Sequence, residues 1–594
     1  MRMRVKSNPP PSLSRDIEKA RKLVRAVNTH IGAETPKGAP FVIERCDFAG
    51  GGQLVAEFDG KGIGLDKLED WPMVYILTND KEAYVGQTTS VARRMAQHGS
   101  NPEKQSFTSV NIIFNSEFNA SVITDYEHRL IQYMHGDGRY RLTNKNDGMT
   151  DTNYFSKSRY SEMFEDLWGD LRQCDLAEKT LKEIEESDVF KYSPFKGLNL
   201  DQQLALDEIL TAIGERAVSS RPLVVEGMPG TGKTVLAVYL LKRLEDDERF
   251  HGLNIRLMEP ATALRKTLRS ALKTVSGLRP SDVIAPSDLA KAACGFRGRE
   301  ERGFDVVLID EAHLLKRRVN LGMQFGSFDK TCDALGLPKG SSQLDWILSQ
   351  VRIPVFFYDP LQTIGPSGVT PAELKERLGG ALKNPVRLES QMRVKGGRRY
   401  LDYVRSVFAG ERPHRESFLG YDLVFHEDFR GFVDSFEKDL DRSDLTRMVA
   451  GFAWPWQTKP GRTPRKGETR ASFDIEIEDI RLRWNRRQEN WVGLAAKEPS
   501  AAQEVGCIHS IQGYDLSYAY VIIGRDIRLD ESGMFLVADR SNYFDKNGKN
   551  TATQSELDAF VRNVYYVLLT RGIYGTHIYV VDPHLRAYLS QFFA

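Results

Sequence analysis

Gly227-Met-Pro-Gly-Thr-Gly-Lys233-Thr234 is the stretch of sequence that decides the fold of this chain. The apolar run Leu223-Val-Val225 before it predicts a buried strand, and apolar residues recur at helical spacing after it. A glycine-rich loop between a strand and a helix lets backbone N–H groups surround phosphates at the positive end of the helix. The alternative is a glycine-rich turn that binds nothing, which the strand and the helix on either side disfavour. The stretch therefore predicts a site for a nucleoside triphosphate.

Each position of this loop has an expected role. The glycines Gly227, Gly230 and Gly232 allow the backbone to close around the phosphates. Lys233 is expected to reach the β- and γ-phosphates, and Thr234 is expected to hold a magnesium ion. The predicted cofactors are therefore ATP and Mg²⁺.

A second motif places carboxylates beside the phosphates. Phe304-Asp-Val-Val-Leu-Ile309 predicts a buried strand that leads into Asp310-Glu311-Ala-His313. We expect Asp310 to hold magnesium through its water shell, and Glu311 to orient and deprotonate the attacking water. The alternative for Glu311 is a residue that only caps a helix.

Length and composition describe a modular protein of ordinary polarity. A chain of 594 residues is too long for one core and predicts three or four domains. Hydrophobic residues make up 41% and charged residues 27%, and no apolar run is long enough to cross a bilayer. The start of the chain, Met1-Arg-Met-Arg-Val-Lys6, lacks the apolar stretch of a signal peptide. We expect a cytoplasmic protein that does not contact membranes.

The five cysteines do not define a metal site or a disulfide framework. They are widely spaced, without a C-x-x-C pair, which fits a reducing cytoplasm. The positions are Cys46, Cys174, Cys294, Cys332 and Cys507.

The net charge is only +1, so contacts with nucleic acid must come from local basic stripes. Each stripe alone is more often a solvated face than a binding surface. The stripes are Arg265/Lys266/Arg269/Lys273, Lys316/Arg317/Arg318, Lys395/Arg398/Arg399 and Arg481/Arg483/Arg486/Arg487. Four tryptophans near the last stripe could stack on unpaired bases or fill a core: Trp454, Trp456, Trp484 and Trp491.

The predicted fold class is α/β, with a small N-terminal domain followed by two doubly wound parallel sheets. Residues 41 to 150 alternate short strands with one or two helices, and we place the domain itself at 66–150 after an N-terminal extension, 1–65. Residues 151–195 form a linker in which one connecting helix is expected to end near Ser193-Pro194. The two sheets are expected at 196–385 and 386–594, the second with an insertion at about 411–500.

Further motifs resemble those of superfamily 1 helicases. Val355-Phe-Phe-Tyr-Asp-Pro-Leu-Gln362 resembles their third motif, which makes Gln362 the expected sensor of the γ-phosphate. Gln202 matches the glutamine that reads adenine in these enzymes. Cys507-Ile-His-Ser-Ile-Gln-Gly-Tyr-Asp515 resembles the fifth motif, which couples nucleotide state to the nucleic-acid backbone. Arg393 and Arg571 match the arginines that stabilise charge on the transferring phosphoryl group.

The sequences of these motifs are similar to those of a bacterial family related to the helicase-like domain of Schlafen proteins. The resemblance is carried by Val505-Gly-Cys-Ile-His-Ser-Ile-Gln-Gly and Leu568-Leu-Thr-Arg-Gly-Ile-Tyr-Gly, and it covers about residues 196 to 594. It implies two RecA-like domains that close on ATP and move along, or clamp, a nucleic-acid strand.

The small N-terminal domain resembles the GIY-YIG nucleases. The family's two motifs, GIY and YIG, correspond here to Met73-Val-Tyr75-Ile and Ala83-Tyr84-Val-Gly86. The sequence departs from these motifs at Met73, Val74 and Val85, which are backbone and packing positions. The residues that match the family's catalytic positions are Tyr75, Tyr84, Arg94, His98, Glu127 and Asn144, and Asn146 competes with Asn144. Taken singly, Tyr75 could be a core residue and His98 a surface histidine.

The resemblance implies a coherent chemistry for phosphodiester hydrolysis. Glu127 would hold Mg²⁺ or Mn²⁺, Arg94 would bind the phosphate, and Tyr84 or His98 would activate water. Arg94 and His98 are one helical turn apart and therefore share a helix face.

Two hypotheses follow from the sequence. In the first, ATP-driven closure delivers a strand to the nuclease domain, in defence against foreign DNA or in DNA repair. In the second, the protein is a nucleotide-switched sensor or clamp without unwinding, whose N-terminal domain mainly binds. Nucleic acid is the expected partner, DNA rather than RNA, and an oligomer or partner proteins are compatible with either hypothesis.

Overall fold

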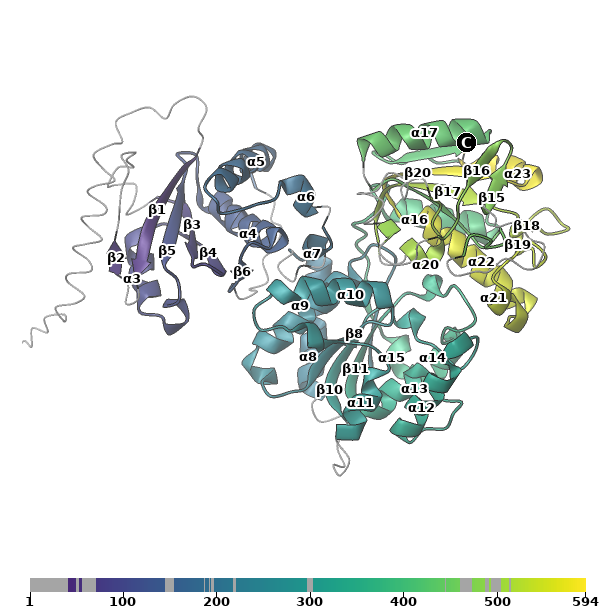
Figure 1. The fold of residues 1–594 in the computed structure, drawn as a ribbon, viewed down its shortest axis with the longest axis horizontal. Helices are drawn as coiled ribbons and strands as arrows, with labels where there is room; N and C mark the ends of the chain where they lie inside the picture. Colours follow the sequence, from purple (N-terminus) through teal and green to yellow (C-terminus); the bar gives the residue numbers. More distant parts are fainter. Residues whose placement is uncertain are drawn as a thin grey trace, which may run out of the picture. The chain divides into compact units, whose positions relative to one another are not determined.

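The computed structural model describes residues 41–49, 53–55, 71–144, 154–185, 187–191, 193, 197–216, 221–295, 303–443, 445–459, 473–486, 491–492, 504–511 and 514–593. The contacts of the chain divide it into two compact units, which are described separately. The first unit is Met1–Gln203 with Val238–His251 and Thr267–Asp282, and the second is Leu204–Ala237 with Gly252–Lys266 and Val283–Ala594. Figure 1 labels their helices and strands.

The first unit is built on a mixed sheet with the strand order β2-β1-β5-β3-β4-β6. All neighbours are antiparallel except β4 and β6. The strands are β1 (Val42–Ala49), β2 (Gln53–Val55), β3 (Met73–Thr78), β4 (Glu82–Thr88), β5 (Ser109–Phe114) and β6 (Arg141–Leu142). The sheet therefore begins before residue 66, since β1 pairs with β5 along Val42–Asp47.

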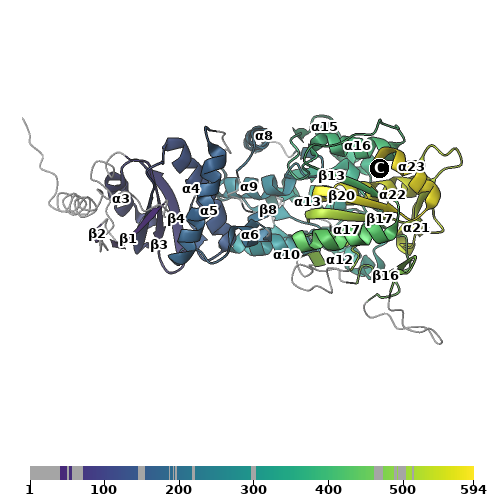
Figure 2. The ribbon, with the colours of Figure 1, turned by 90° about the horizontal axis from the view of Figure 1, so that it is seen from above.

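Helices cover both faces of this sheet. α3 (Val91–Gly99) lies on one side, and α4 (Ala120–Asp137) lies on the other with α5 behind it (Figures 1 and 2). The side chain of Asn119 caps α4 by accepting from two backbone N–H groups, and Gly138 ends the helix with a φ of 76°.

The linker contains three helices rather than the one that we expected. They are α5 (Lys157–Gln173), α6 (Leu181–Glu185) and α7 (Asp188–Lys191). The chain turns after α5 because the Asp137 carboxylate accepts from the backbone N–H groups of Glu178 and Lys179, the shortest contact being 2.7 Å. A helix through that point would have used those two N–H groups itself.

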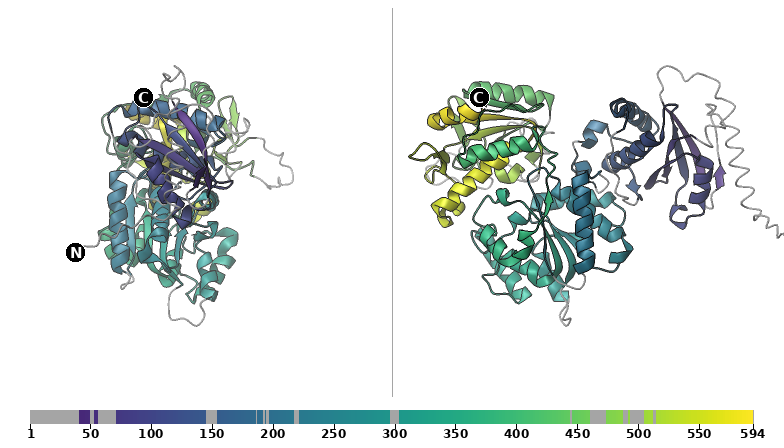
Figure 3. Two further views of the ribbon diagram at one scale, coloured as in Figure 1. Left: turned by 90° about the vertical axis from the view of Figure 1, so that its left-hand side faces the viewer. Right: turned by 180° about the vertical axis from the view of Figure 1, so that it is seen from behind.

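The second unit holds two parallel sheets. The first has the order β12-β7-β11-β10-β8-β9, and every neighbouring pair is parallel. Its strands are β7 (Leu223–Gly227), β8 (Ile255–Met258), β9 (Val283–Ile284), β10 (Phe304–Ile309), β11 (Val351–Tyr358) and β12 (Val386–Leu388). The chain crosses from β7 to β8 and then returns, and right-handed crossovers in opposite directions place helices on both faces, as Figures 1 and 3 show.

The second parallel sheet has the order β13-β20-β17-β14. Its strands are β13 (Asp422–His426), β14 (Arg447–Ala450), β17 (Leu516–Ile523) and β20 (Gly572–Val580). α17 (Phe429–Arg442) packs its phenylalanines on one face, and α16 (Gly397–Ala409) with α22 (Gln554–Leu569) packs on the other (Figure 1).

Two expected boundaries need correction. β12 starts at Val386, where we expected the second sheet, but it pairs with β7 of the first sheet. β13, α17 and β14 lie inside the expected insertion at 411–500, yet both strands belong to the second sheet. These strands have only four or five residues each and little alternation, so the sequence pattern that would mark them is weak.

The remaining elements connect the sheets or flank them. The helices are α8 (Leu200–Arg216), α9 (Lys233–Asp246), α10 (Thr262–Ala271), α11 (Asp288–Gly295), α12 (Phe325–Leu335), α13 (Gln343–Gln350), α14 (Pro371–Leu378), α15 (Gly380–Lys383), α20 (Ile508–Ile511), α21 (Lys546–Thr551) and α23 (Pro583–Phe593). Two hairpins are formed by β15 (Ile475–Ile477) with β16 (Ile480–Leu482), and by β18 (Ile527–Leu529) with β19 (Leu536–Ala538).

Burial decides between the alternatives that the tryptophans and cysteines left open. Trp484 and Trp491 are 2% and 1% exposed and belong to cores, so these two do not form a stacking surface. Trp454 and Trp456 are half-buried against the core that contains Trp484. The cysteines whose side chains are described are free thiols, as we expected. Within the described part of the chain, none of the helices has the length and apolar character needed to cross a bilayer.

Candidate nucleotide site and N-terminal cluster

The glycine-rich loop joins the end of β7 to the start of α9, as we expected. Gly230 and Gly232 have φ angles of 82° and 78°, in the left-handed region that glycine enters without strain. A Cβ on Gly230 would lie 2.7 Å from the Cβ of Arg393. The N–H of Met392 donates to the Gly230 carbonyl at 2.9 Å, so the segment after β12 lies directly against the loop.

Lys233 is 6% exposed and points into the loop. Its ammonium donates to the carbonyl of Gly227 at 2.6 Å and to that of Met228 at 3.2 Å. It also lies 3.6 Å from a carboxylate oxygen of Asp359, which follows β11. A lysine at this position is a charge that phosphates of a nucleotide would engage.

Asp310 and Glu311 follow β10, which pairs with β8 and β11 in the middle of the sheet. Asp310 is fully buried, and burial together with the Glu311 charge raises its pKa to about 7. The Thr234 hydroxyl and the Glu311 N–H act in the opposite direction. Burial also raises the pKa of Glu311, but His313, Lys233 and other cations outweigh burial, and the pKa lies below its ordinary value.

The alternative role of Glu311 as a helix cap is not supported. It stands before the short 3₁₀ helix Ala312–Leu314 with a φ of 45°, and its side chain makes no capping hydrogen bond. One of its carboxylate oxygens lies 3.4 Å from Nε2 of the buried His313. Glu311 therefore does not cap this short helix through its side chain.

Glu259 is a third buried carboxylate, which the sequence analysis missed. It follows β8, and Asp310 follows β10 one position beyond the register pair Met258–Ile309. Burial, Asp310 and Glu311 raise the pKa of Glu259 well above its ordinary value, while one oxygen accepts from the Ala261 N–H at 2.6 Å. Only its position at the end of a strand could have indicated it.

The residues at this point fit a magnesium ion. Oδ2 of Asp310 is buried without a hydrogen-bond partner, and the Thr234 hydroxyl is near the same carboxylate. Hard carboxylate and hydroxyl oxygens beside phosphates are the ligands that Mg²⁺ prefers. Among the described residues, no group of three or more His, Cys, Asp or Glu side chains surrounds a common metal position.

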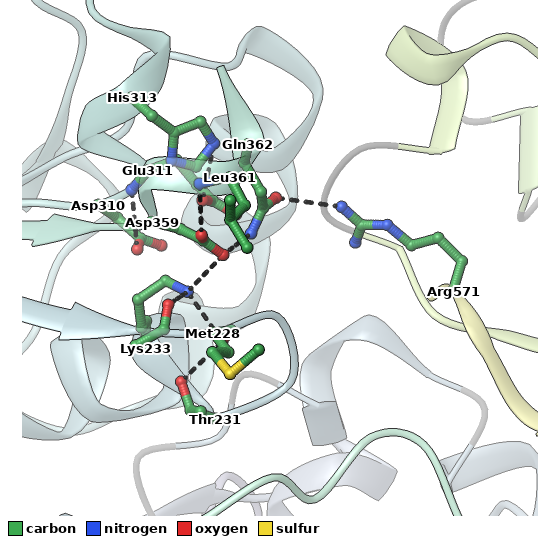
Figure 4. A network of polar contacts seen from close by, with 11 residues as sticks. Met228, Thr231, Lys233, Asp310, Glu311, His313, Asp359, Leu361, Gln362 and Arg571 are labelled. Atoms are coloured by element: carbon green, nitrogen blue, oxygen red, sulfur yellow. Dashed lines mark hydrogen bonds and ion pairs between the residues drawn. The ribbon is translucent and has the colours of Figure 1, made fainter. Parts of the chain in front are cut away.

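A continuous polar network leads from the loop to the second parallel sheet (Figure 4). Asp359 accepts from the side-chain amide of Gln362 at 2.6 Å, in the 3₁₀ turn Pro360–Gln362. Gln362 in turn accepts from Arg571 at 3.4 Å, and Arg571 also donates to the Tyr514 carbonyl at 3.3 Å. Gln362 and Arg571 are 3% and 2% exposed, so the network is shielded from water.

Two other predicted residues have different surroundings. Arg393 is paired with Asp515 of the fifth-motif segment. Gln202 is 1% exposed, and it exchanges hydrogen bonds with Asn199 at the start of α8. The adenine-reading role of Gln202 stays a prediction. Gln512 and Gly513 of the fifth motif lie outside the described residues.

A cavity of about 440 Å³ opens beside this site. It is lined by residues near the start of α10, by His313 and Lys316, and by Phe452 and His509 of the second sheet's surroundings. Burial lowers the pKa of Lys316. Several arginines of the expected basic stripes are instead paired on the surface, among them Arg318 with Asp329, Arg399 with Glu416 and Arg481 with Glu476.

These features define the second unit as a P-loop nucleoside triphosphatase with two parallel sheets. Residues 220–582 match the model of the Schlafen group 3 DNA/RNA helicase domain, and the chain belongs to that family. The match covers both parallel sheets and the whole network from Lys233 to Arg571.

Individual relatives are more distant. The uncharacterized protein YPL245W of Saccharomyces cerevisiae is 25% identical over 405 residues, which is 62% of this chain and 83% of that protein. The Pif1 helicase from Candida albicans aligns with a TM-score of 0.26 and 10% identity, over 66% of this chain and 96% of its own. S. cerevisiae Dbp5 bound to RNA and ADP BeF3 aligns at 0.25 and 11%, over 67% and 92%. TM-scores of this size do not define a shared fold, so the fold assignment rests on topology.

The first unit brings together most residues of the predicted N-terminal site. Tyr75 on β3 and Tyr84 on β4 share one face of the sheet, because they pair with Gly86 and Leu77 in the antiparallel register. The Tyr75 hydroxyl lies 2.7 Å from Nε2 of His98 and accepts from Nε of Arg94 at 3.1 Å. His98 is 5% exposed, so the surface alternative for it is wrong.

Electrostatics around this cluster favour a neutral histidine and protonated tyrosine. Burial, Arg94 and Lys104 lower the pKa of His98 to about 4. Burial raises the pKa of Tyr75, and the Glu127 charge adds to the effect. The Tyr75 hydroxyl therefore accepts from Arg94 and shares a second hydrogen bond with the neutral His98, whose direction is set by the imidazole tautomer.

Glu127 and Asn144, the other two predicted residues of this site, have different contacts. Glu127 is half-buried on α4, close enough to Tyr75 to influence its pKa. The Asn144 amide accepts from the Val85 N–H at 3.0 Å and donates to the Val85 carbonyl at 2.8 Å. Both of its polar groups therefore hold β4, which is a structural use, and Asn146 lies outside the described residues.

Proposed function

We propose that this protein is a nucleic-acid-dependent ATPase of the helicase type, with two RecA-like domains. The observation that carries the proposal is the buried network Lys233–Asp359–Gln362–Arg571, which joins the phosphate loop to the second parallel sheet. A nucleotide that displaces Lys233 from Asp359 would disturb every member of this network. A change in the bound nucleotide would then change the contacts of Arg571, which precedes β20 of the second sheet.

The residues have separate roles in hydrolysis. Thr234 and Asp310 would hold Mg²⁺, which when bound neutralises charge on the β- and γ-phosphates. Lys233 and Arg571 would stabilise the charge of the transferring phosphoryl group. Glu311, whose pKa lies below the ordinary value, is ionised at neutral pH and able to accept a proton from the attacking water.

Nucleic acid would enter the cavity lined by Lys316, Phe452 and His509. Phe452 and His509 are ring neighbours, with centroids 5.9 Å apart, and aromatic surfaces of this kind stack on bases without reading sequence. We expect DNA rather than RNA as the strand. Such an enzyme would serve in defence against foreign DNA or in DNA repair.

ATP hydrolysis by the purified chain, with and without single-stranded DNA or RNA, tests this proposal. We expect hydrolysis that nucleic acid stimulates, and a loss of about 100-fold or more in Lys233→Ala and Glu311→Gln. The exposed Lys339→Ala serves as the matched control. A wild-type protein that binds ATP but does not hydrolyse it under any of these conditions would contradict the proposal.

We infer a second activity for the N-terminal unit, phosphodiester cleavage of the GIY-YIG type. Its support is the contact set of Tyr75, His98 and Arg94, with Glu127 nearby on α4. Glu127 would supply one hard oxygen ligand, since Mg²⁺ or Mn²⁺ commonly keeps waters and substrate phosphates at its other positions. Arg94 would bind the phosphate, and Tyr84 or His98 would activate the attacking water.

Labelled DNA with Mg²⁺ or Mn²⁺ tests the cleavage activity. Glu127→Ala and Arg94→Ala should each abolish cleavage while the protein stays folded by circular dichroism. The exposed Glu103→Ala on the same unit is the matched control. Cleavage that persists in Glu127→Ala would overturn the inference.

The nucleotide-switched sensor remains the second candidate function, supported by the same network. It differs in one measurement, because a clamp binds strands tightly without separating a duplex. ATP-dependent separation that disappears in Lys233→Ala excludes the clamp, whereas tight ATP-dependent binding without separation supports it.

A further inference from the structure

Lys104 is a buried cation beside the cluster of Tyr75, Tyr84, Arg94 and His98, and the sequence analysis gave it no role. It ends the short 3₁₀ helix η1 (Pro102–Lys104), which the Asn101 side chain caps by accepting from the Glu103 N–H. The Lys104 N–H donates to the Asn101 carbonyl at 3.0 Å, and its own carbonyl accepts from Phe107 at 3.3 Å. These bonds fix the backbone of Lys104, whose side chain is only 7% exposed.

The ammonium of Lys104 lies over the ring of Tyr84, 3.3 Å from the ring centroid. An ammonium above an aromatic face is attracted by the ring's negative quadrupole, and the attraction strengthens when water is excluded. The Phe107 ring lies farther away, 5.7 Å from the ammonium. Tyr84 also meets the His98 ring edge-on, with centroids 5.5 Å apart.

Tyr84 is thus held from several directions. Its phenol oxygen accepts a hydrogen bond from Arg94, which also donates to Tyr75. Lys104 covers the ring, and His98 touches it from α3. The arrangement leaves the ring little rotational freedom.

Lys104 places a second cation close to the site that contains Arg94. Moving an ammonium out of water costs free energy, and positive charge gathered at one point attracts an anion. In this unit that anion would be the phosphate of the strand that is cleaved.

We propose that Lys104 is a positioning residue of the N-terminal site, which holds the Tyr84 ring in its working orientation against Arg94 and His98. The proposal rests on the cleavage activity inferred for this unit. It also explains why η1 has its own cap directly after α3, since the cap sets where the Lys104 side chain starts.

The first readout does not depend on cleavage. The groups that face His98 are Arg94 on its own helix, Lys104 on η1, and the two tyrosines on β3 and β4. In Lys104→Met the apolar stem stays but the charge is lost, so the pKa of His98 should rise from about 4, because Lys104 is one of the groups that lower it, and NMR of labelled histidines over a range of pH measures the rise. Lys104→Arg should leave it low, and His98→Gln assigns the resonance.

The second readout is cleavage of labelled DNA. We expect Lys104→Met to lower kcat about tenfold or more with little change in KM, and Lys104→Arg to restore most of it. The exposed Lys81→Met, at the turn between β3 and β4, should behave as wild type. Unchanged cleavage and an unchanged His98 pKa in Lys104→Met would overturn the proposal, as would an arginine variant that folds but behaves like the methionine variant. A wild type that does not cleave would refute the activity itself, while the histidine titration would still decide whether Lys104 acts on the cluster.

Discussion

The ring of Tyr75 lies directly against Gly86, and this contact makes the glycine irreplaceable. A Cβ at position 86 would stand 2.2 Å from the Tyr75 hydroxyl oxygen and 2.4 Å from the adjacent ring carbon. Such distances are far below van der Waals contact, and the ring is buried and bonded to His98 and Arg94. The tyrosine would therefore have to leave its partners.

We expect Gly86→Ala to destabilise the first unit by about 1–3 kcal/mol and to abolish cleavage, because overpacking moves the ring. Denaturant unfolding measures the first effect. Gly169→Ala is the matched control, since Gly169 lies inside α5 with nothing within 4 Å of an added Cβ. That variant should gain up to about 1 kcal/mol from helix propensity. A Gly86→Ala protein as stable and active as wild type would contradict the contact.

Asp526 gives the second unit a pH-dependent stability. Its carboxylate is fully buried and accepts from the Tyr565 hydroxyl at 2.5 Å, and burial raises its pKa from 3.8 to about 7. A raised pKa means that the folded state holds the proton more tightly than the unfolded state. The ionisation penalty is thus absent below about pH 4 and grows as the pH rises to about 7.

We expect Asp526→Asn to become more stable relative to wild type as the pH rises from 4 to 7.5, by on the order of a few kcal/mol. Urea unfolding of both proteins at several pH values measures the difference. The exposed Asp333→Asn should show no such trend. A difference that stays constant over this range would show that Asp526 does not carry the penalty.

At the scale of elements, a hydrogen bond joins the 3₁₀ turn Pro360–Gln362, which follows β11, to Arg571, which precedes β20. Gln362 joins Asp359 to Arg571, so removing either Gln362 or Arg571 breaks the same path. Residues that act through one contact do not have additive effects.

We expect Gln362→Ala and Arg571→Ala each to lower kcat for ATP hydrolysis by about 100-fold, and the double variant to be little worse than Arg571→Ala alone. Steady-state kinetics of the four proteins complete the cycle. Arg528→Ala, an exposed arginine on β18, controls for the loss of positive charge. Effects that multiply would mean that the two side chains act independently.

At the scale of the whole molecule, each unit has its own core. Tyr75, Met95 and Val110 belong to the core of the first unit, whereas the second unit has a core around each parallel sheet. The glycine-rich loop and the carboxylates that follow β10 lie in the second unit. A ligand that binds only the folded loop adds its binding free energy to that unit.

We expect a slowly hydrolysed ATP analogue with Mg²⁺, at about 100 times its Kd, to stabilise the second unit by about 2.7 kcal/mol. Differential scanning calorimetry should show its transition rise in temperature, and Lys233→Ala should remove the shift. Gly86→Ala identifies the transition of the first unit. The expectation fails if the analogue binds but moves no transition.

Local patterns in the sequence were enough to predict the phosphate loop, the carboxylates after β10 and the two tyrosines on paired strands. The loop is set by glycines that take positive φ angles within a few residues of each other, and buried strands show as apolar runs. The short strands β13 and β14 were hidden because their stability comes from packing on β20 and β17 rather than from their own pattern. The prediction of a single helix in the linker was wrong for a similar reason. Asp137, whose carboxylate accepts from the backbone after α5, lies outside the linker.

The sequence alone therefore determined the phosphate loop and the carboxylates at the strand end, because both depend on neighbours in the chain. Only the tertiary structure decided which groups meet. Glu259 joins Asp310 through the register of β8 with β10, Arg571 reaches Gln362 across more than two hundred positions, and the Asn144 amide bonds to the backbone of β4. The physical reason is that burial and electrostatic coupling depend on distance in space, which residues far apart in the chain acquire only when their strands pair and their helices pack.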